Sequence, residues 1–280
     1  MTTGHEWNGI KELNTPVPRT VFFFLIVTFV FSAGYWLLMP AWPLGLTYTK
    51  GLLGINQHSD VNASLKQAAA SKAGWIDKIA TMPVETIRAD ASLMRIVRET
   101  ARPLFGDNCA ACHGSEAQGG PGFPKLTDND WLWGGDAETI METLRVGINS
   151  THAETRVSEM LAFGEQGMLD RASIQDVTAY VKSLSARRDT PDKIAGVAKG
   201  KEIFAQHCAS CHGENGTGNI ELGAPNLADD VWLYGGDKQS IHTTIYNGRQ
   251  GTMPYWEGRL TSTDRKILTL YILERESKNP

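Results

Sequence analysis

The sequence predicts an all-α protein in which one N-terminal membrane-spanning helix precedes two repeated helical domains. Three observations carry this prediction: a long run without charge near the N-terminus, a block of residues that recurs at a fixed offset, and apolar residues at helical spacing. At 280 residues, with 41% hydrophobic and 21% charged residues, the chain is long enough for two domains. A net charge of −4 without any basic cluster predicts no nucleic-acid partner.

The first element is a transmembrane helix, predicted over residues 21–39 after an N-terminal arm of residues 1–20. No charged residue occurs between Val21 and Thr49. The apolar core of about 19 residues is long enough to cross a hydrocarbon layer of roughly 30 Å. A cleaved signal peptide would have a shorter apolar run followed by small residues. We therefore expect a retained anchor in the lipid bilayer.

The orientation of this anchor follows from the basic residues on its two sides. Lys11 and Arg19 precede the span, and Lys50 is the first base after it. The positive-inside rule then places the N-terminal arm in the cytoplasm and everything after about residue 45 on the opposite side.

The rest of the chain contains an internal repeat. The motif Trp-Leu-Trp-Gly-Gly-Asp at residues 131–136 recurs as Trp-Leu-Tyr-Gly-Gly-Asp at residues 232–237, an offset of 101 residues. The repeat predicts a connector at 40–90, a first domain at 91–187 and a second at 196–276, with a polar hinge at Arg187–Lys199. Apolar spacing predicts six helices, at 91–105, 137–147, 170–185, 197–208, 238–247 and 262–274, and no alternating run resembles a strand.

The connector is less strongly patterned than the two domains. Residues 64–72 have a helical composition. Trp75 and Ile79 follow them as apolar residues that could pack on a neighbouring subunit or lie on the membrane surface. The sequence leaves these two possibilities open.

All four cysteines lie in two copies of one motif. The copies are Cys109-Ala110-Ala111-Cys112-His113 and Cys208-Ala209-Ser210-Cys211-His212. Cys-x-x-Cys-His is the attachment signature of c-type haem, in which both thiols bond to the porphyrin and the histidine binds the iron. A zinc ribbon would bring the second pair within about 15–20 residues of the first, and a thioredoxin-like motif would need a βαβ setting. We therefore predict two covalently bound haem c groups.

The second axial ligand of each iron is predicted to be methionine, the common partner of histidine in c-type haem. Met253, which Pro254 follows, is the candidate in the second domain. In the first domain Met160 and Met168 both lie in the appropriate loop. Met160 is favoured, while Met168 is interpreted as a core residue. Spacing leaves open whether each methionine binds the iron of its own domain or that of the other. Weaker rivals are three histidines, His152, His207 and His242.

Each domain resembles a small cytochrome c. Phe105 and Phe204 lie four residues before the first cysteine of their motifs, and Tyr180 and Tyr271 lie in the last predicted helix of each domain. In cytochromes c this phenylalanine packs the N-terminal helix against the C-terminal one. The resemblance therefore implies that Phe105 meets Tyr180 and that Phe204 meets Tyr271. The Met160 loop also resembles the family's ligand loop, with Leu161 where proline is usual.

The whole architecture resembles the dihaem subunit (subunit III) of cbb3-type cytochrome c oxidases. The most specific element is the arm segment Asn-Gly-Ile-Lys-Glu-Leu-Asn-Thr-Pro-Val-Pro at residues 8–18. The resemblance implies a single-pass protein of the bacterial inner membrane with periplasmic haem domains. It accepts electrons from a donor cytochrome c and passes them through a monohaem subunit to the haem–copper subunit, which reduces oxygen.

On this interpretation the chain is an electron carrier of the respiratory chain with no catalytic residues of its own. Two alternatives remain at this point. One is a free-standing membrane-anchored dihaem shuttle, and the other is a dihaem peroxidase, which two plausible methionine ligands disfavour.

Overall fold

The structure is a computed structural model, and it describes residues 2–185 and 196–276. The chain forms two compact units, residues 1–74 and 75–280, which are described separately. Most of the predicted hinge at Arg187–Lys199 lies outside the described residues.

The N-terminal arm contains a β-hairpin that the sequence analysis did not expect. Strand β1 (Thr2–Trp7) pairs antiparallel with β2 (Ile10–Leu13). The two residues between them, Asn8 and Gly9, have φ values of 50° and 85°. Asn-Gly is the preferred sequence for a two-residue hairpin turn with positive φ at both positions. The expectation of no strand was therefore wrong for this arm. The Asn-Gly turn produces a hairpin here although the flanking residues lack a clear alternation of apolar and polar side chains.

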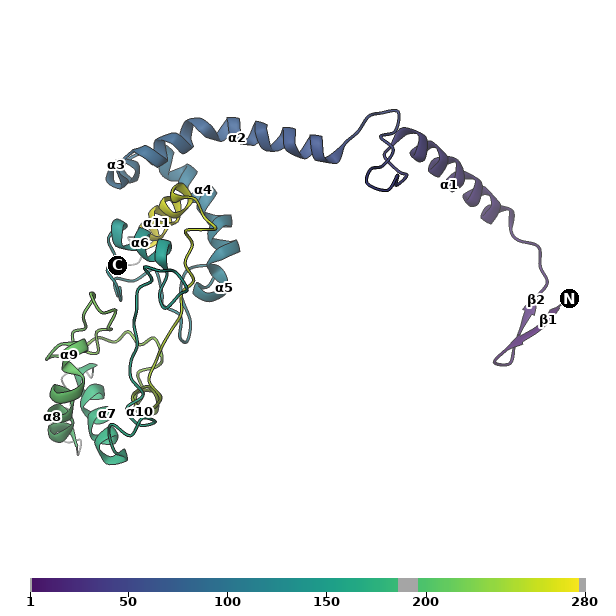
Figure 1. The fold of residues 1–280 in the computed structure, drawn as a ribbon. Helices are drawn as coiled ribbons and strands as arrows, with labels where there is room; N and C mark the ends of the chain where they lie inside the picture. The colour runs from purple at the N-terminus through teal and green to yellow at the C-terminus, as the bar shows by residue number, and fades with distance from the viewer. Residues whose placement is uncertain (1, 186–195, 277–280) are drawn as a thin grey trace. The chain divides into compact units, whose positions relative to one another are not determined.

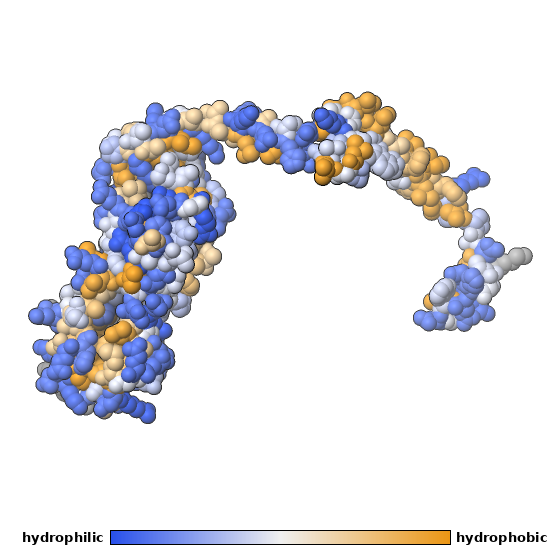
Figure 2. Space-filling view, in the orientation of Figure 1, coloured by the Kyte–Doolittle hydropathy of each residue, from blue (hydrophilic) through white to orange (hydrophobic). Residues whose placement is uncertain are grey.

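Helix α1 (Arg19–Leu38) follows the arm, and its ends lie within two residues of the helix predicted at 21–39. It begins after Pro18, a residue suited to helix starts, and none of its side chains is buried. Figure 2 shows hydrophobic residues along this helix. A helix that is apolar on all sides and covered by no protein requires an apolar solvent, so α1 fits a membrane anchor.

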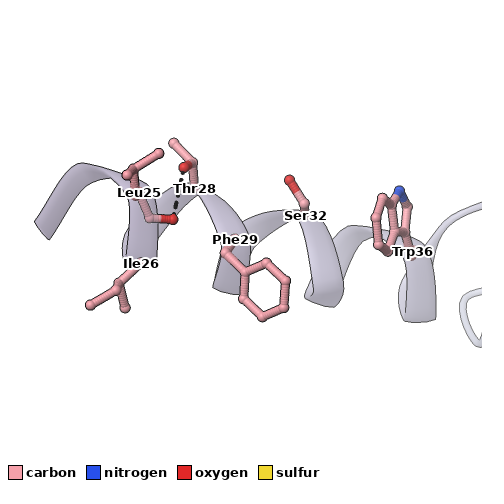
Figure 3. Close-up of a pocket in the computed structure, with 6 residues that line it drawn as sticks. All are labelled: Leu25, Ile26, Thr28, Phe29, Ser32 and Trp36. Carbon is pink, nitrogen blue, oxygen red and sulfur yellow. Dashed lines mark hydrogen bonds between the residues drawn. The ribbon is translucent and has the colours of Figure 1, made fainter. Parts of the chain in front are cut away.

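The surface of α1 has a shallow depression, shown in Figure 3. Its lining is apolar apart from Thr28, Ser32 and the indole nitrogen of Trp36. The Thr28 hydroxyl donates to the carbonyl oxygen of Leu25 at 3.0 Å, so this donor is satisfied within the helix, as a lipid environment requires. No ionisable side chain lines the depression, and it has no features of a cofactor site.

Beyond α1 the chain folds back on the end of the helix. The Leu52 and Leu53 amides donate to the carbonyls of Leu37 and Leu38. Gly51 has φ +66°, and a Cβ there would lie 2.7 Å from the Met39 carbonyl carbon, so glycine is required for this close approach. Helix α2 (Gln57–Thr81) then extends well beyond the predicted segment at 64–72.

The end of α2 and the short helix α3 (Val84–Ala89) belong to the core of the second unit. Ile79 and Ile87 are fully buried there, and Trp75 packs against the same core. The expectation that Trp75 and Ile79 pack on another subunit or on the membrane surface was therefore wrong. An amphipathic stripe shows that a face is covered, but not what covers it.

The six predicted helices all form, and two short helices carry the cysteine motifs. They are α4 (Ala91–Asn108), α5 (Ala110–His113), α6 (Ala137–Val146), α7 (Arg171–Ser185), α8 (Val197–His207), α9 (Ala209–His212), α10 (Lys238–Asn247) and α11 (Ser262–Glu276). The repeated Gly-Gly-Asp motif explains two of the helix starts. Asp136 and Asp237 accept hydrogen bonds from backbone amides in the first turns of α6 and α10.

The helices pack into two lobes that have exchanged their last helices (Figure 1). The first lobe contains α4, α5 and α6, and its last helix is α11 from the end of the chain. The second lobe contains α8, α9 and α10, and its last helix is α7. Each lobe thus combines parts of both sequence repeats.

The exchange corrects the expected aromatic pairs. Phe105 contacts Tyr271, with ring centroids 5.8 Å apart, and Phe204 contacts Tyr180 at 5.2 Å. The expected pairs, Phe105 with Tyr180 and Phe204 with Tyr271, were wrong. The aromatic contact between first and last helices exists in both lobes, but the partner comes from the other repeat.

Two extended segments, 147–170 and 248–261, carry the chain between the lobes and pair with each other at equivalent points. Met253 and Ile148 exchange both backbone hydrogen bonds, and so do Met160 and Arg249. Ile148 and Arg249 correspond in the repeat, so the two crossings are related by the same 101-residue offset.

Candidate haem sites

The cysteine motifs lie where a long helix ends and a short one begins. Cys109 follows α4 and Cys208 follows α8, and both pack partly buried against the core of their lobe. Cys112 and Cys211, one turn later, are exposed. All four cysteines are free. One thiol thus borders each core and the other lies at the surface, an arrangement suited to holding one flat ligand at two points.

The cysteines lack the properties of a redox-active dithiol. Burial raises the pKa of the Cys109 and Cys208 thiols to about 11. Thioredoxin-like motifs depend on a lowered thiol pKa, because the thiolate is the nucleophile. The alternative of a thiol–disulfide exchange motif is therefore disfavoured in both lobes.

The two motif histidines have hydrogen bonds that orient them for binding a metal through Nε2. Nδ1 of His113 lies 2.9 Å from the carbonyl oxygen of Pro124, and Nδ1 of His212 lies 3.0 Å from that of Pro225. A carbonyl can only accept, so Nδ1 must carry the proton, which leaves the Nε2 lone pair available. Burial lowers the pKa of both imidazoles, although the carbonyl bond partly opposes this. A lowered pKa favours the neutral imidazole, which is the form that binds metal.

The two candidate methionines lie in exchanged positions. Met253, from the second repeat, packs against the same core as Cys109, and Met160, from the first repeat, packs against the core that Cys208 borders. Each lobe therefore brings together two cysteines and a histidine from one repeat with a methionine from the other. Met168, interpreted from the sequence as a core residue, is 44% exposed, so that interpretation was wrong.

The rival histidines have other partners. Nε2 of His152 lies 2.8 Å from a carboxylate oxygen of Glu257, the ring of His242 stacks on Tyr246, and the ring of His207 contacts Phe163. These three histidines, the weaker candidates for the second axial ligand, are therefore engaged in contacts within the protein.

The loop that bears Met253 has an ionic anchor that the sequence did not predict. Arg145, on α6, forms ion pairs with Glu142, Glu154 and Glu257. Glu257 also binds His152, and this bond, followed by the charge of Arg145, lowers the pKa of the Glu257 carboxyl. No local pattern could reveal this network, because Glu257 lies more than 100 residues from both Arg145 and His152 in the sequence.

Paired thiols, a histidine with a free Nε2 and a methionine thioether form the protein part of a c-type haem site. The second unit therefore has the features of a c-type cytochrome, and α1 makes it a membrane-anchored one.

Comparisons with known proteins agree with this class and narrow it. The family model described as the N-terminal domain of cytochrome oxidase-cbb3, FixP, matches residues 1–45. The cytochrome c model matches residues 99–185, and the model of cbb3-type cytochrome c oxidase subunit III matches residues 195–272.

Curated relatives match along almost the whole chain. The cbb3-type cytochrome c oxidase subunit FixP of Bradyrhizobium sp. (strain ORS 278) is 46% identical over 97% of this chain and 93% of its own length. The FixP subunit of Azorhizobium caulinodans is 47% identical over 97% and 91%, and the CcoP subunit of Cereibacter sphaeroides is 42% identical over 97% and 93%.

The chain belongs to the FixP/CcoP family, subunit III of cbb3-type cytochrome c oxidase. It is a membrane-anchored electron-transfer subunit of such an oxidase and works with the other oxidase subunits. Membership decides against the two alternatives, the free-standing shuttle and the dihaem peroxidase.

Proposed function

We propose that the chain carries two covalently bound haem c groups. The first is attached at Cys109 and Cys112 with His113 on the iron, and the second at Cys208 and Cys211 with His212 on the iron. The repeated geometry supports this count, because each histidine has the same Nδ1 bond to a proline carbonyl. When bound, the haems supply the one-electron redox chemistry, and the chain's own residues fix their position and ligation.

The second axial ligands come from the opposite repeats, Met253 for the first haem and Met160 for the second. The observation that carries this assignment is the packing of each methionine in the core bordered by the other repeat's cysteine. A thioether ligand raises the reduction potential of a c-type haem. The backbone pairs with Ile148 and Arg249 hold the two methionine segments in place.

The haem lobes lie on the periplasmic side of the bacterial inner membrane, and the hairpin arm lies in the cytoplasm. The basic residues Lys11 and Arg19 before the span support this orientation. The relatives are named as subunits of cbb3-type oxidases. On that basis the chain accepts electrons from a donor cytochrome c and passes them to a monohaem subunit, which supplies the haem–copper subunit where oxygen is reduced.

The count of haems and the crossed ligation are tested together in single-haem variants. Intact mass of the purified full chain should show two haem additions, and replacing Cys208 and Cys211 by alanine should remove one. In this single-haem chain, Met253→Ala should abolish the absorption band of methionine-ligated ferric haem, and Met160→Ala should leave it unchanged. The opposite pattern would mean that each methionine serves its own repeat.

A further inference from the structure

Arg156, a partly buried cation in the first lobe, has no anionic partner among the residues that the structure describes. Nε of Arg156 is inaccessible to solvent and, among the residues that the structure describes, is the one buried side-chain nitrogen or oxygen without a hydrogen bond. Nη2 reaches only the carbonyl oxygen of Thr139, at 3.5 Å, the outer limit of a hydrogen bond. The guanidinium lies over the ring of Trp133, 5.0 Å from its centroid.

The nearby carboxylates do not fill this role. Within the described part of the chain, no Asp or Glu oxygen lies within 4.0 Å of the Arg156 guanidinium. The charge of Arg156 contributes to lowering the pKa of Glu142, but the largest cause of that shift is the hydrogen bond from Arg145. Guanidinium stays charged in proteins and offers five donors in a planar fork. A partly buried cation whose Nε is inaccessible to water and unpaired is unfavourable unless an anion completes the site.

Arg156 lies beside the proposed ligand loop of the first haem. Its backbone is paired with the chain at Ile148, whose other side is paired with Met253. Thr139 and Trp133 belong to the start of α6 and the motif before it, in the same lobe as Cys109. The unpaired donor therefore lies among the segments that surround the first haem site.

The second lobe repeats the arrangement with one difference. Arg249 lies over Tyr234, 4.4 Å from the ring centroid, and its backbone pairs with Met160. Trp133 and Tyr234 are equivalent residues of the repeat. In contrast to Arg156, Nε of Arg249 donates to the Thr244 hydroxyl at 3.0 Å. The recurrence shows that a cation stacked on this aromatic residue is a feature of both lobes.

We propose that Arg156 binds a propionate carboxylate of the haem attached at Cys109 and Cys112, with Nε as one of the donors. This inference rests on the proposed presence of that haem. A haem brings carboxylates into a lobe where no side-chain anion meets Arg156, and Arg is suited to planar, bidentate recognition of carboxylate.

This pairing has two consequences for the first haem. A fixed positive charge near the iron stabilises the ferrous state, because reduction removes one positive charge from the site. Arg156 also holds the propionate in its ionised form. Without the guanidinium the ionised propionate is uncompensated, so the reduction potential falls. The propionate pKa then rises, and the potential becomes higher as the pH falls and the propionate takes up a proton.

The test is a redox titration of the full haem-loaded chain in detergent at several pH values. Arg156→Gln should reduce the ratio of ferrous to ferric first haem by about tenfold at a fixed poise, a downward shift of about 59 mV for one electron. It should also introduce a pH dependence near neutrality that the unmodified chain lacks. Arg156→Lys should restore most of the potential, because it keeps the charge.

The matched control is Arg259→Gln. Arg259 also lies over a tryptophan of the first lobe, Trp256, at 4.1 Å, but it is exposed. It should change neither the potential nor its pH dependence. An unchanged potential and pH profile in Arg156→Gln with full haem content would overturn the proposal. A potential of the unmodified chain that shifts with added inorganic phosphate, but not in Arg156→Gln, would assign the site to a free anion instead.

Two measurements keep this test separate from the proposed function. Intact mass and the methionine–iron band of the unmodified chain report haem attachment and ligation independently of Arg156. If Arg156→Gln fails to attach the first haem, resonance Raman of Arg156→Lys should still show a shifted propionate bending mode, and an unshifted mode would refute the contact.

Discussion

Exchange of the last helices predicts which aromatic residues are energetically coupled. Phe105 and Phe204 are each 1% exposed, and their partners Tyr271 and Tyr180 are 5% and 8% exposed. Replacing one ring by leucine removes part of a buried contact in either lobe. Replacing both members of a contacting pair removes their mutual interaction only once, so a double-mutant cycle should isolate it.

The expected magnitude follows from the ring geometry. Centroid separations of 5.8 Å and 5.2 Å fall in the range where aromatic pairs contribute about 0.5–1.5 kcal/mol beyond their buried area. Phe105→Leu with Tyr271→Leu should therefore show a coupling free energy of this size. Phe105→Leu with Tyr180→Leu joins residues of different lobes and should be additive within about 0.5 kcal/mol.

The assay is denaturant unfolding of the full chain in detergent, followed by the methionine–iron absorption band of each haem in single-haem variants. This signal reports the closure of one lobe at a time and avoids assuming that the whole chain unfolds in one step. Coupling between Phe105 and Tyr180, with none between Phe105 and Tyr271, would refute the exchanged arrangement and restore two contiguous domains.

Three further predictions concern the ligand loops. Gly147→Ala places a Cβ 2.5 Å from the Met253 carbonyl oxygen at φ +70°, so it should weaken the methionine–iron band of the first haem alone, while Gly248→Ala at the equivalent crossing should affect only the second. The folded-state pKa of Glu257 is lowered, chiefly by the hydrogen bond from His152. The stability that Glu257 contributes is therefore present above its unfolded pKa of about 4.3 and is lost as the pH falls through the lower folded pKa. An acid titration of the first-haem band should show this loss, and Glu257→Gln should abolish it. Leu161→Pro should stabilise the second ligand loop by about 0.4–1 kcal/mol in denaturant unfolding, because the Leu161 amide donates to no described backbone group and proline restricts the unfolded chain. A loss of stability would show that the backbone at residue 161 does not fit the conformation of proline.

The local parts of the candidate site could be predicted from the sequence. Cys109, Cys112 and His113 lie within one short motif, and their spacing alone predicts attachment and proximal ligation. Helix limits were predicted closely because apolar periodicity and the caps at Asp136 and Gly147 act within a few residues. Function followed from the arm and the motifs together, since no feature of the haem lobes alone distinguishes an oxidase subunit from other electron carriers.

The exchange of helices could not be read from the sequence. Tyr180 and Tyr271 occupy the same position on helices with similar apolar faces, and each face fits either partner helix. An apolar stripe specifies that a surface is buried, but two similar copies offer two similar partners. The buried Nε of Arg156, which has no hydrogen-bond partner, could not be predicted either. Nothing in the local sequence shows that a charged side chain in a loop is partly buried.

The exchange of the last helices also couples the two haem sites mechanically. In two contiguous cytochrome domains, a hinge would allow the haems to move apart, and the transfer rate between them would vary with their separation. Here both crossing segments are held by backbone pairs, at Ile148 with Met253 and at Arg249 with Met160, and each segment carries a methionine into the opposite lobe. Movement of one lobe against the other would therefore pull directly on both ligand loops. With the proposed ligation, the same backbone pairs would hold both methionine segments, so that the electron relay and the integrity of each haem site would depend on the same contacts.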